Sequence, residues 1–190
     1  MNLLFVGLLI FLGVHSISIV APGWRERMLR RLGEKGWKGL YSLISIAGFA
    51  LILIGYSAAR QSPQLVYSPP LWTRHLAALL LLPVFPLLIA TYFPGRIRRA
   101  VGHPMLIATV LWAGAHLLGT TTRADLLLFG SFLGWALADW ASARTRPARA
   151  LPGAPPSAWN DAIAVVLGIG MYLLMALWAH RWLIGIAPFG

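Results

Sequence analysis

The fold follows from apolar segments such as residues 102–118, which read GHPMLIATVLWAGAHLL. Two histidines, His103 and His116, lie thirteen residues apart in this segment. At a rise of about 1.5 Å and a turn of about 100° per residue, one helix places them roughly 20 Å apart on nearly opposite faces. They cannot bind the same small ligand, so each needs partners from other parts of the chain.

The composition is that of an integral membrane protein. Of 190 residues, 58% are hydrophobic and only 11% are charged, and the mean hydropathy is +0.73. A soluble domain has about one quarter charged residues. Because a chain in lipid must satisfy its main-chain polar groups internally, we expect an all-α fold, a polytopic membrane helix bundle. The chain has no cysteine, which excludes disulfides, iron–sulfur clusters and thiolate nucleophiles.

About six transmembrane helices are expected. A helix needs about twenty apolar residues to cross the hydrocarbon layer, and six segments reach or approach this length. Pro83 and Pro86 predict a kink in the third. The N-terminus lacks the basic start of a secretory signal, so we expect the first segment to be retained. The predicted spans are residues 3–20, 40–59, 71–92, 104–118, 126–140 and 162–184.

The basic residues predict the orientation. The odd-numbered connections carry twelve Lys and Arg, whereas the even-numbered connections and the C-terminal end carry four. Since cytoplasmic loops carry the excess, we expect both termini to be non-cytoplasmic. The net charge of +11 is explained in this way, and nucleic acid is not an expected partner. The basic segment 25–38 is either an interfacial helix attracted to anionic lipid or a surface for an acidic partner.

Two histidines are candidates for chemistry within the membrane, where ionisable groups are costly and usually functional. His15 lies about twelve residues into a span that enters from outside, and His116 about twelve residues into one that enters from the cytoplasm. Each is therefore expected roughly 18 Å deep, near the membrane midplane. His103 is expected at the cytoplasmic surface, and His75 and His180 near the outer surface.

Two midplane imidazoles on different helices suit haem b, whose iron takes axial ligands from opposite faces. His15 and His116 are the predicted iron ligands. Thr109, Trp112 and Thr120 would line the cofactor pocket, because they lie on or beside the His116 face and leave room beside an aromatic wall. The alternatives are a non-haem metal and a structural role, in which each histidine only hydrogen-bonds another helix.

Three further features have mainly structural interpretations. The Gly130–Gly134 pair forms a GxxxG motif, which predicts close packing of another helix or contact of a ligand with the main chain. Asp139 is expected to pair with an arginine at the cytoplasmic end, and Asp161 to cap the last helix. A catalytic carboxylate pair is not expected, because none of the five acidic residues lies in the middle of a span.

Many of these residues resemble the NnrU family of membrane proteins. The resemblance extends over most of the chain, so we interpret residues 1–190 as a single NnrU-like transmembrane domain. The matching stretches are GVHS (13–16), GWKGLYSL (36–43), RHL (74–76), HPM (103–105), LWA with AHLL (111–118), LFGSF (128–132) and HRWL followed by glycine (180–185).

The resemblance implies a place in the bacterial inner membrane and a role in denitrification and nitric oxide metabolism. The plant zeta-carotene isomerase, a haem b enzyme with redox-sensitive histidine ligation, looks like a distant relative that contains this domain. Its ligand motifs correspond to the sequences around His15 and His116. The resemblance therefore implies haem b at these residues, serving electron transfer or isomerase-like chemistry on a lipophilic substrate.

Two alternatives remain. Membrane methyltransferases carry an Arg-His-Pro motif that helps bind S-adenosylmethionine, and Gly102-His103-Pro104 is similar. The arginine is replaced by glycine, however, and the C-terminal acidic pair of those enzymes is missing. The other alternative is a non-enzymatic assembly or regulatory factor for a nitrogen-oxide reductase, which would bind a membrane protein partner through the GxxxG face.

Overall fold

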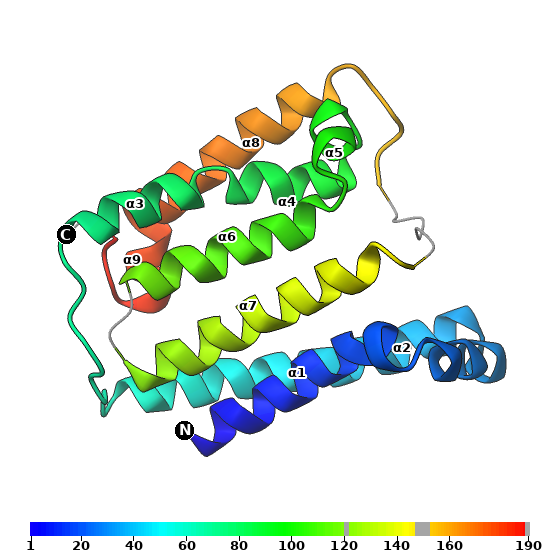
Figure 1. The fold of residues 1–190 in the computed structure, drawn as a ribbon, viewed down its shortest axis with the longest axis horizontal. Helices are drawn as coiled ribbons and strands as arrows, with labels where there is room; N and C mark the ends of the chain where they lie inside the picture. Colours follow the sequence, from blue (N-terminus) through cyan, green and yellow to red (C-terminus); the bar gives the residue numbers. More distant parts are fainter. Residues whose placement is uncertain (120–121, 147–152, 189–190) are drawn as a thin grey trace. The chain divides into compact units, whose positions relative to one another are not determined.

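The computed structural model describes residues 1–119, 122–146 and 153–188, and nearly all of its regular structure is helical (Figure 1). The only described extended pairing is an isolated bridge between Leu65 and Thr122. The helices are α1 (Asn2–Val20), α2 (Pro22–Arg60), α3 (Trp72–Leu81), α4 (Val84–Tyr92), α5 (Arg96–Val101), α6 (Pro104–Gly119), α7 (Arg123–Ala143), α8 (Asn160–Leu174), the π-helix η1 (Met175–Ala179) and α9 (His180–Ile184).

The helices form two compact units that interleave along the sequence. The first unit comprises Met1–Ser68 and Thr120–Arg144, and it contains α1, α2 and α7. The second comprises Pro69–Gly119 and Thr145–Gly190, and it contains the other helices. Within the first unit, α1 packs along α2 and α7 packs against α1; within the second, α4 packs against both α6 and α8.

The helices confirm an all-α membrane protein. Five described helical segments are long and apolar enough to cross a membrane: α1, α2, α3 with α4, α7, and α8 through α9. The remaining predicted span is α6, which is apolar but has only 16 residues. Each predicted segment thus corresponds to one helical segment, although α2 and α7 extend beyond the predicted apolar limits.

Large apolar side chains on these helices face outward. Leu43 and Ile46 of α2 are each 66% exposed, and Leu177 of η1 is 76% exposed. In water, so much exposed apolar surface would favour aggregation. In a bilayer the same side chains face lipid tails, which makes the exposure expected rather than costly.

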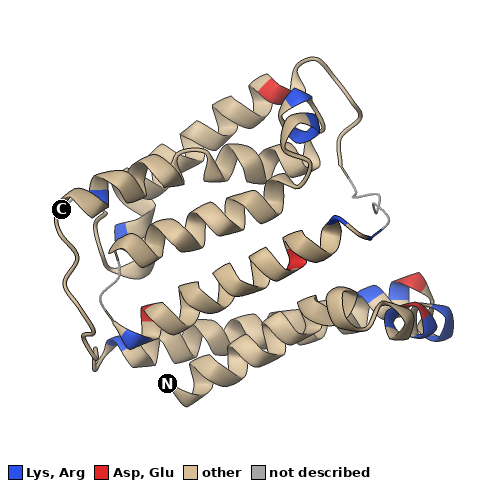
Figure 2. Cartoon of the chain, viewed as in Figure 1, with Lys and Arg blue, Asp and Glu red and all other residues tan. Residues whose placement is uncertain are grey.

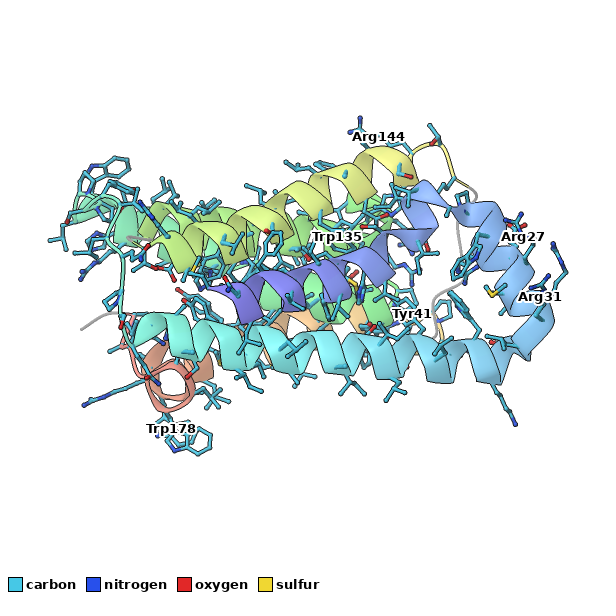
Figure 3. All side chains as sticks on the ribbon, turned by 90° about the horizontal axis from the view of Figure 1, so that it is seen from below. Arg27, Arg31, Tyr41, Trp135, Arg144 and Trp178 are labelled. Atoms are coloured by element: carbon cyan, nitrogen blue, oxygen red, sulfur yellow. The ribbon has the colours of Figure 1, made fainter. Side chains whose placement is uncertain are left out.

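Two local breaks shape the long helical segments. Pro83 stands between α3 and α4, so the predicted kink is confirmed as a break at residues 82–83. Gly33 interrupts α2 with φ 69° and ψ 170°, a backbone conformation that glycine adopts without steric cost. The basic residues before Gly33 therefore lie on a short helix of their own, from which Arg27 and Arg31 extend (Figure 3).

Glycines allow α1 and α2 to pack with their main chains in contact. A Cβ at Gly7 would lie 2.6 Å from a main-chain nitrogen of α2, and one at Gly48 would lie 2.8 Å from the main-chain nitrogen of Phe11. A Cβ at Gly55 would collide with the main chain of Leu4. Because lipid gives no hydrophobic force between helices, this close approach supplies the van der Waals contact that holds them together.

The predicted role of the GxxxG motif is not observed in the first unit. A Cβ added at Gly130 or Gly134 would meet no described heavy atom within 4 Å. Close packing of described helices in this unit depends on Gly7, Gly48 and Gly55 instead, whose spacing does not form a GxxxG motif.

The second unit has a small apolar core and a polar junction. Val84, Leu87 and Ala108 are buried between α4 and α6. At the junction, the Asp161 carboxylate accepts hydrogen bonds from the main-chain N–H groups of Arg96 (2.8 Å) and Ile97 (3.1 Å). The prediction that Asp161 caps the last helix is therefore wrong. Asp161 belongs to the first turn of α8 but caps the neighbouring α5.

Most basic residues of each unit gather at one of its ends, and a few lie at the other (Figure 2). In the first unit they lie where α2 begins and where α7 ends, and in the second they lie on α5 beside the start of α8. This agrees with the alternation of charge along the sequence. The membrane face to which each end belongs stays a prediction from the positive-inside rule.

The glycine contacts predict a difference between two alanine variants. Gly48→Ala should lower the thermal unfolding temperature in detergent, because its methyl group overlaps the main chain of α1; overpacking of this kind costs about 1–3 kcal/mol. Gly130→Ala, which meets open space, is the matched control and should unfold at or slightly above the wild-type temperature, since alanine favours helix. Equal unfolding temperatures for both variants would contradict this packing.

The Asp161 cap predicts a second pair of variants. Asp161→Ala should destabilise the protein by about 0.5–2 kcal/mol, because two main-chain N–H groups of α5 lose their acceptor. Asp161→Asn retains a carbonyl oxygen and should recover part of this loss. Thermal unfolding followed by helical circular dichroism measures both, and wild-type behaviour of the alanine variant would show that the cap is energetically unimportant.

Candidate functional site

His15 lies among aromatic side chains in the first unit. Its ring stacks on Phe11, with 4.3 Å between ring centroids, and contacts Tyr41 at 5.2 Å and Trp135 at 6.0 Å in edge-on arrangements. These contacts come from α1, α2 and α7, so all three helices of the unit meet at this imidazole. Tyr41 and Trp135 are labelled among these helices in Figure 3.

The His15 surroundings contain a buried polar group without a described partner. The indole Nε1 of Trp135 is buried and makes no hydrogen bond to the described residues. An unsatisfied buried donor is costly. The Trp135 N–H, which lies in an aromatic cluster next to the His15 imidazole, therefore marks a place where a hydrogen-bond acceptor could bind.

His116 lies in the last turn of α6, in the second unit. Its Nδ1 is 2.8 Å from the main-chain oxygen of Trp112, and the two rings lie 5.3 Å apart. Ala113 and Ala115, which come just before His116 on α6, are fully buried. His116 is expected near the membrane midplane, and it lies three residues before Gly119, the last described residue of α6.

His180 lies close to His116, a pairing that nothing in the sequence indicates. The two ring centroids are 6.5 Å apart, and the ring planes are inclined by 21°. His180 is expected near the outer surface and His116 near the midplane, and within the second unit their rings lie close together. The depth of the pair in the membrane stays a prediction.

The hydrogen bonds of three histidines define their tautomers. His15 Nδ1 is 2.6 Å from the oxygen of Phe11, His116 Nδ1 is 2.8 Å from that of Trp112, and His180 Nδ1 is 2.8 Å from that of Ile186. A main-chain oxygen can only accept, so each Nδ1 carries a proton, and in the neutral ring the lone pair is then on Nε2. Such an orienting hydrogen bond is typical of histidines that bind metals.

The other predicted site residues are placed as follows. Thr109 lies two turns before His116 on the same face, and its hydroxyl donates to the oxygen of Met105 at 2.9 Å. Thr120 lies outside the described residues. His75 is exposed on α3, and His103 precedes α6 with its main-chain N–H donating to Val101. The contact of Trp112 with His116 is the closest match to the predicted pocket.

Two cavities of the described part of the chain are lined by no histidine. One of about 360 Å³ lies by α5 and the start of α8, where Arg96, Arg99 and Asp161 contribute to its lining. His103 is not part of this lining, so the cavity gives no support for the S-adenosylmethionine alternative. A second, of about 220 Å³, lies beside Gln64 and Arg123 in the first unit.

The donor set favours a cofactor over a bare metal ion. The described residues contain no group of three or more His, Cys, Asp or Glu that could hold a metal ion. Protein sites for transition-metal ions such as Zn²⁺ use three or four such ligands. Haem brings its own four equatorial nitrogens, so one or two imidazoles are enough to hold it. The histidines of this chain fit haem in that respect.

The fold defines a class of protein: a polytopic helical membrane protein. Its helices carry histidine side chains that could bind a ligand. The family model described as NnrU protein matches residues 3–188, which include both units. The chain therefore belongs to the NnrU family. Comparisons with curated proteins and with solved structures give no match.

The aromatic contacts predict that His15 also supports the fold. His15→Ala should lower the unfolding temperature, because each aromatic contact contributes about 0.5–1.5 kcal/mol. His15→Phe retains the ring and should recover most of that stability while removing the nitrogen ligand. Thermal unfolding in detergent checks this, with His75→Ala as the exposed control. Equal unfolding of His15→Ala and His75→Ala would show that the cluster contributes little.

Proposed function

We propose that this protein binds haem b in the bacterial inner membrane, with His116 as an iron ligand, and that it serves nitric oxide metabolism and denitrification. The observation that carries this proposal is the hydrogen bond from His116 Nδ1 to the oxygen of Trp112. This bond leaves the lone pair on Nε2 and holds the ring in one orientation. Neutral imidazole of this kind is the usual axial ligand of haem b.

The surroundings of His116 suit a flat apolar group. The Trp112 ring lies beside the imidazole, and the small residues Ala113 and Gly114 precede it on α6. A Cβ at Gly114 would meet no described heavy atom within 4 Å. When bound, haem supplies electron transfer or a binding position for a small ligand at its iron. The chain supplies the imidazole, its orientation and an apolar wall.

His15 has the same tautomer and is the second iron ligand that the sequence predicts. It belongs to the first unit, whereas His116 belongs to the second. The experiment below therefore replaces His116 alone. Within the first unit, Phe11, Tyr41 and Trp135 surround His15, so replacing it affects packing as well as ligation.

The apolar outer surface favours a lipophilic partner. Many large side chains on the described helices face outward, as Leu43 and Leu177 do, and a substrate dissolved in the bilayer could reach the helices directly. We therefore include electron transfer and isomerase-like chemistry on a lipophilic substrate within the proposal, and a membrane protein partner is compatible with it.

An absorption spectrum of the purified protein tests haem binding. The wild type, produced in cells supplied with a haem precursor, should show a Soret band with about one haem per chain. His116→Ala should lose the band or at least most of its haem, because the axial imidazole is removed, whereas His75→Ala should keep the wild-type spectrum. Helical circular dichroism should be unchanged in all three. A wild type without a Soret band, even after haem is added, would refute the proposal.

A further inference from the structure

The cavity of about 360 Å³ in the second unit lies where α5 meets the start of α8. Pockets that hold small molecules or their parts have volumes of about 300–1,000 Å³. Two parts of the chain line it: residues 94–96 with Arg99, and residues 156–158 with Asp161. Figure 2 shows the basic residues of α5 beside the acidic residue at the start of α8.

Hydrogen bonds hold the two lining segments together. The Ala154 N–H donates to the oxygen of Tyr92 at 2.8 Å. The side-chain amide of Asn160, which is buried, donates to the oxygens of Pro94 and Pro155, both at 3.0 Å. The carboxylate bonds from α8 to α5 described above add to these contacts. The cavity is therefore formed before any ligand binds, which lowers the entropic cost of binding.

Two cationic side chains of the lining have no partner in the described part of the chain. The guanidinium groups of Arg96 and Arg99 form no hydrogen bond or ion pair with the described residues. Their charges act on the carboxylate of Asp161, which accepts its hydrogen bonds from main-chain N–H groups instead. Two positive charges and one negative charge leave the lining with a net charge of +1. One phosphodiester, which carries a single negative charge, would neutralise it.

The apolar surface next to the cavity favours a lipid as the source of that phosphodiester. Val165 lies one turn after Asp161 on the same side of α8 and is 45% exposed, and its neighbour Val166 is 69% exposed. In a bilayer these side chains contact acyl chains. A phospholipid can fill the cavity with its headgroup and cover this surface with its tails, whereas free phosphate would use the cavity alone.

We propose that Arg96 and Arg99 bind the phosphodiester of a membrane phospholipid in this cavity, with the acyl chains along the exposed side of α8. Guanidinium groups match phosphate oxygens in geometry as well as in charge. The bound lipid joins α5 to the start of α8, in addition to the cap that Asp161 provides. This site contains no histidine and is independent of the proposed haem.

Binding of dioleoyl phosphatidylglycerol to the purified protein in detergent tests the proposal, with native mass spectrometry as the measurement. The wild type should bind one lipid more tightly than any further ones. Arg96→Gln and Arg99→Gln should each weaken this binding about tenfold or more, because a hydrogen bond between charged groups contributes at least that much. Arg98→Gln is the matched control. It removes the same charge from the same helix but lies outside the lining, so it should bind as the wild type does.

Two further probes separate a lipid from a free phosphate compound. Dioleoylglycerol has the same tails without the phosphate, and glycerophosphate has the phosphate without the tails. Neither should bind as tightly as the phospholipid. Equally tight binding of glycerophosphate would overturn the assignment to a lipid, and equally tight binding of dioleoylglycerol would overturn the role of the arginines.

A variant that fills the cavity tests its part in binding. Ala158→Trp adds a large side chain to the lining without changing its charge, so it should also prevent tight binding of the lipid. Helical circular dichroism should be that of the wild type in every variant. Tight binding retained in Ala158→Trp, or equal weakening in Arg96→Gln, Arg99→Gln and Arg98→Gln, would show only a general attraction between a basic surface and an anionic lipid and would overturn the proposed site.

Discussion

The ring nitrogens of the histidines must find their hydrogen-bond acceptors inside the protein, because lipid tails offer none. At His15 and His116 the acceptor is the main-chain oxygen four residues earlier on the same helix. At His180 it is the oxygen of Ile186, which the chain supplies by turning back after Gly185. The consequence is the same at all three. The tautomer of the neutral ring is set by the fold, with the proton on Nδ1.

The same lack of solvent explains how the helices hold together. Few large side chains are fully buried, and Leu4 is the largest apolar one. Instead, α1 and α2 approach through Gly7, Gly48 and Gly55, and a Cβ at Gly168 of α8 would collide with Pro86 of α4. These contacts depend on shape rather than on the removal of apolar surface from water. Small residues therefore matter more to this fold than large apolar ones.

Properties that depend on the sequence alone were predictable, and those that depend on helix ends or contacts were not. Residue hydropathy gave the spans, and Pro83 gave the break between α3 and α4, because proline cannot donate the helical hydrogen bond. The role of the GxxxG motif stays a prediction, whereas the close packing of α1 and α2 depends on glycines that are not four residues apart. Asp161 caps a helix 65 positions away along the chain, which local capping rules cannot indicate. The π-helix η1 and the contact of His180 with His116 had no local signal.

The interleaving of the two units has a consequence for biogenesis. The pair α1 and α2 leaves the ribosome first, but its third helix, α7, begins at Arg123, and 62 residues separate it from the end of α2 at Arg60. At about 5–20 residues per second, synthesis of that interval takes ~3–12 s. During this time the helices α3 to α6 are synthesised while the first unit still lacks its third helix. The Gly7–Gly48–Gly55 contact, complete after the first two helices, can hold α1 and α2 together until α7 follows.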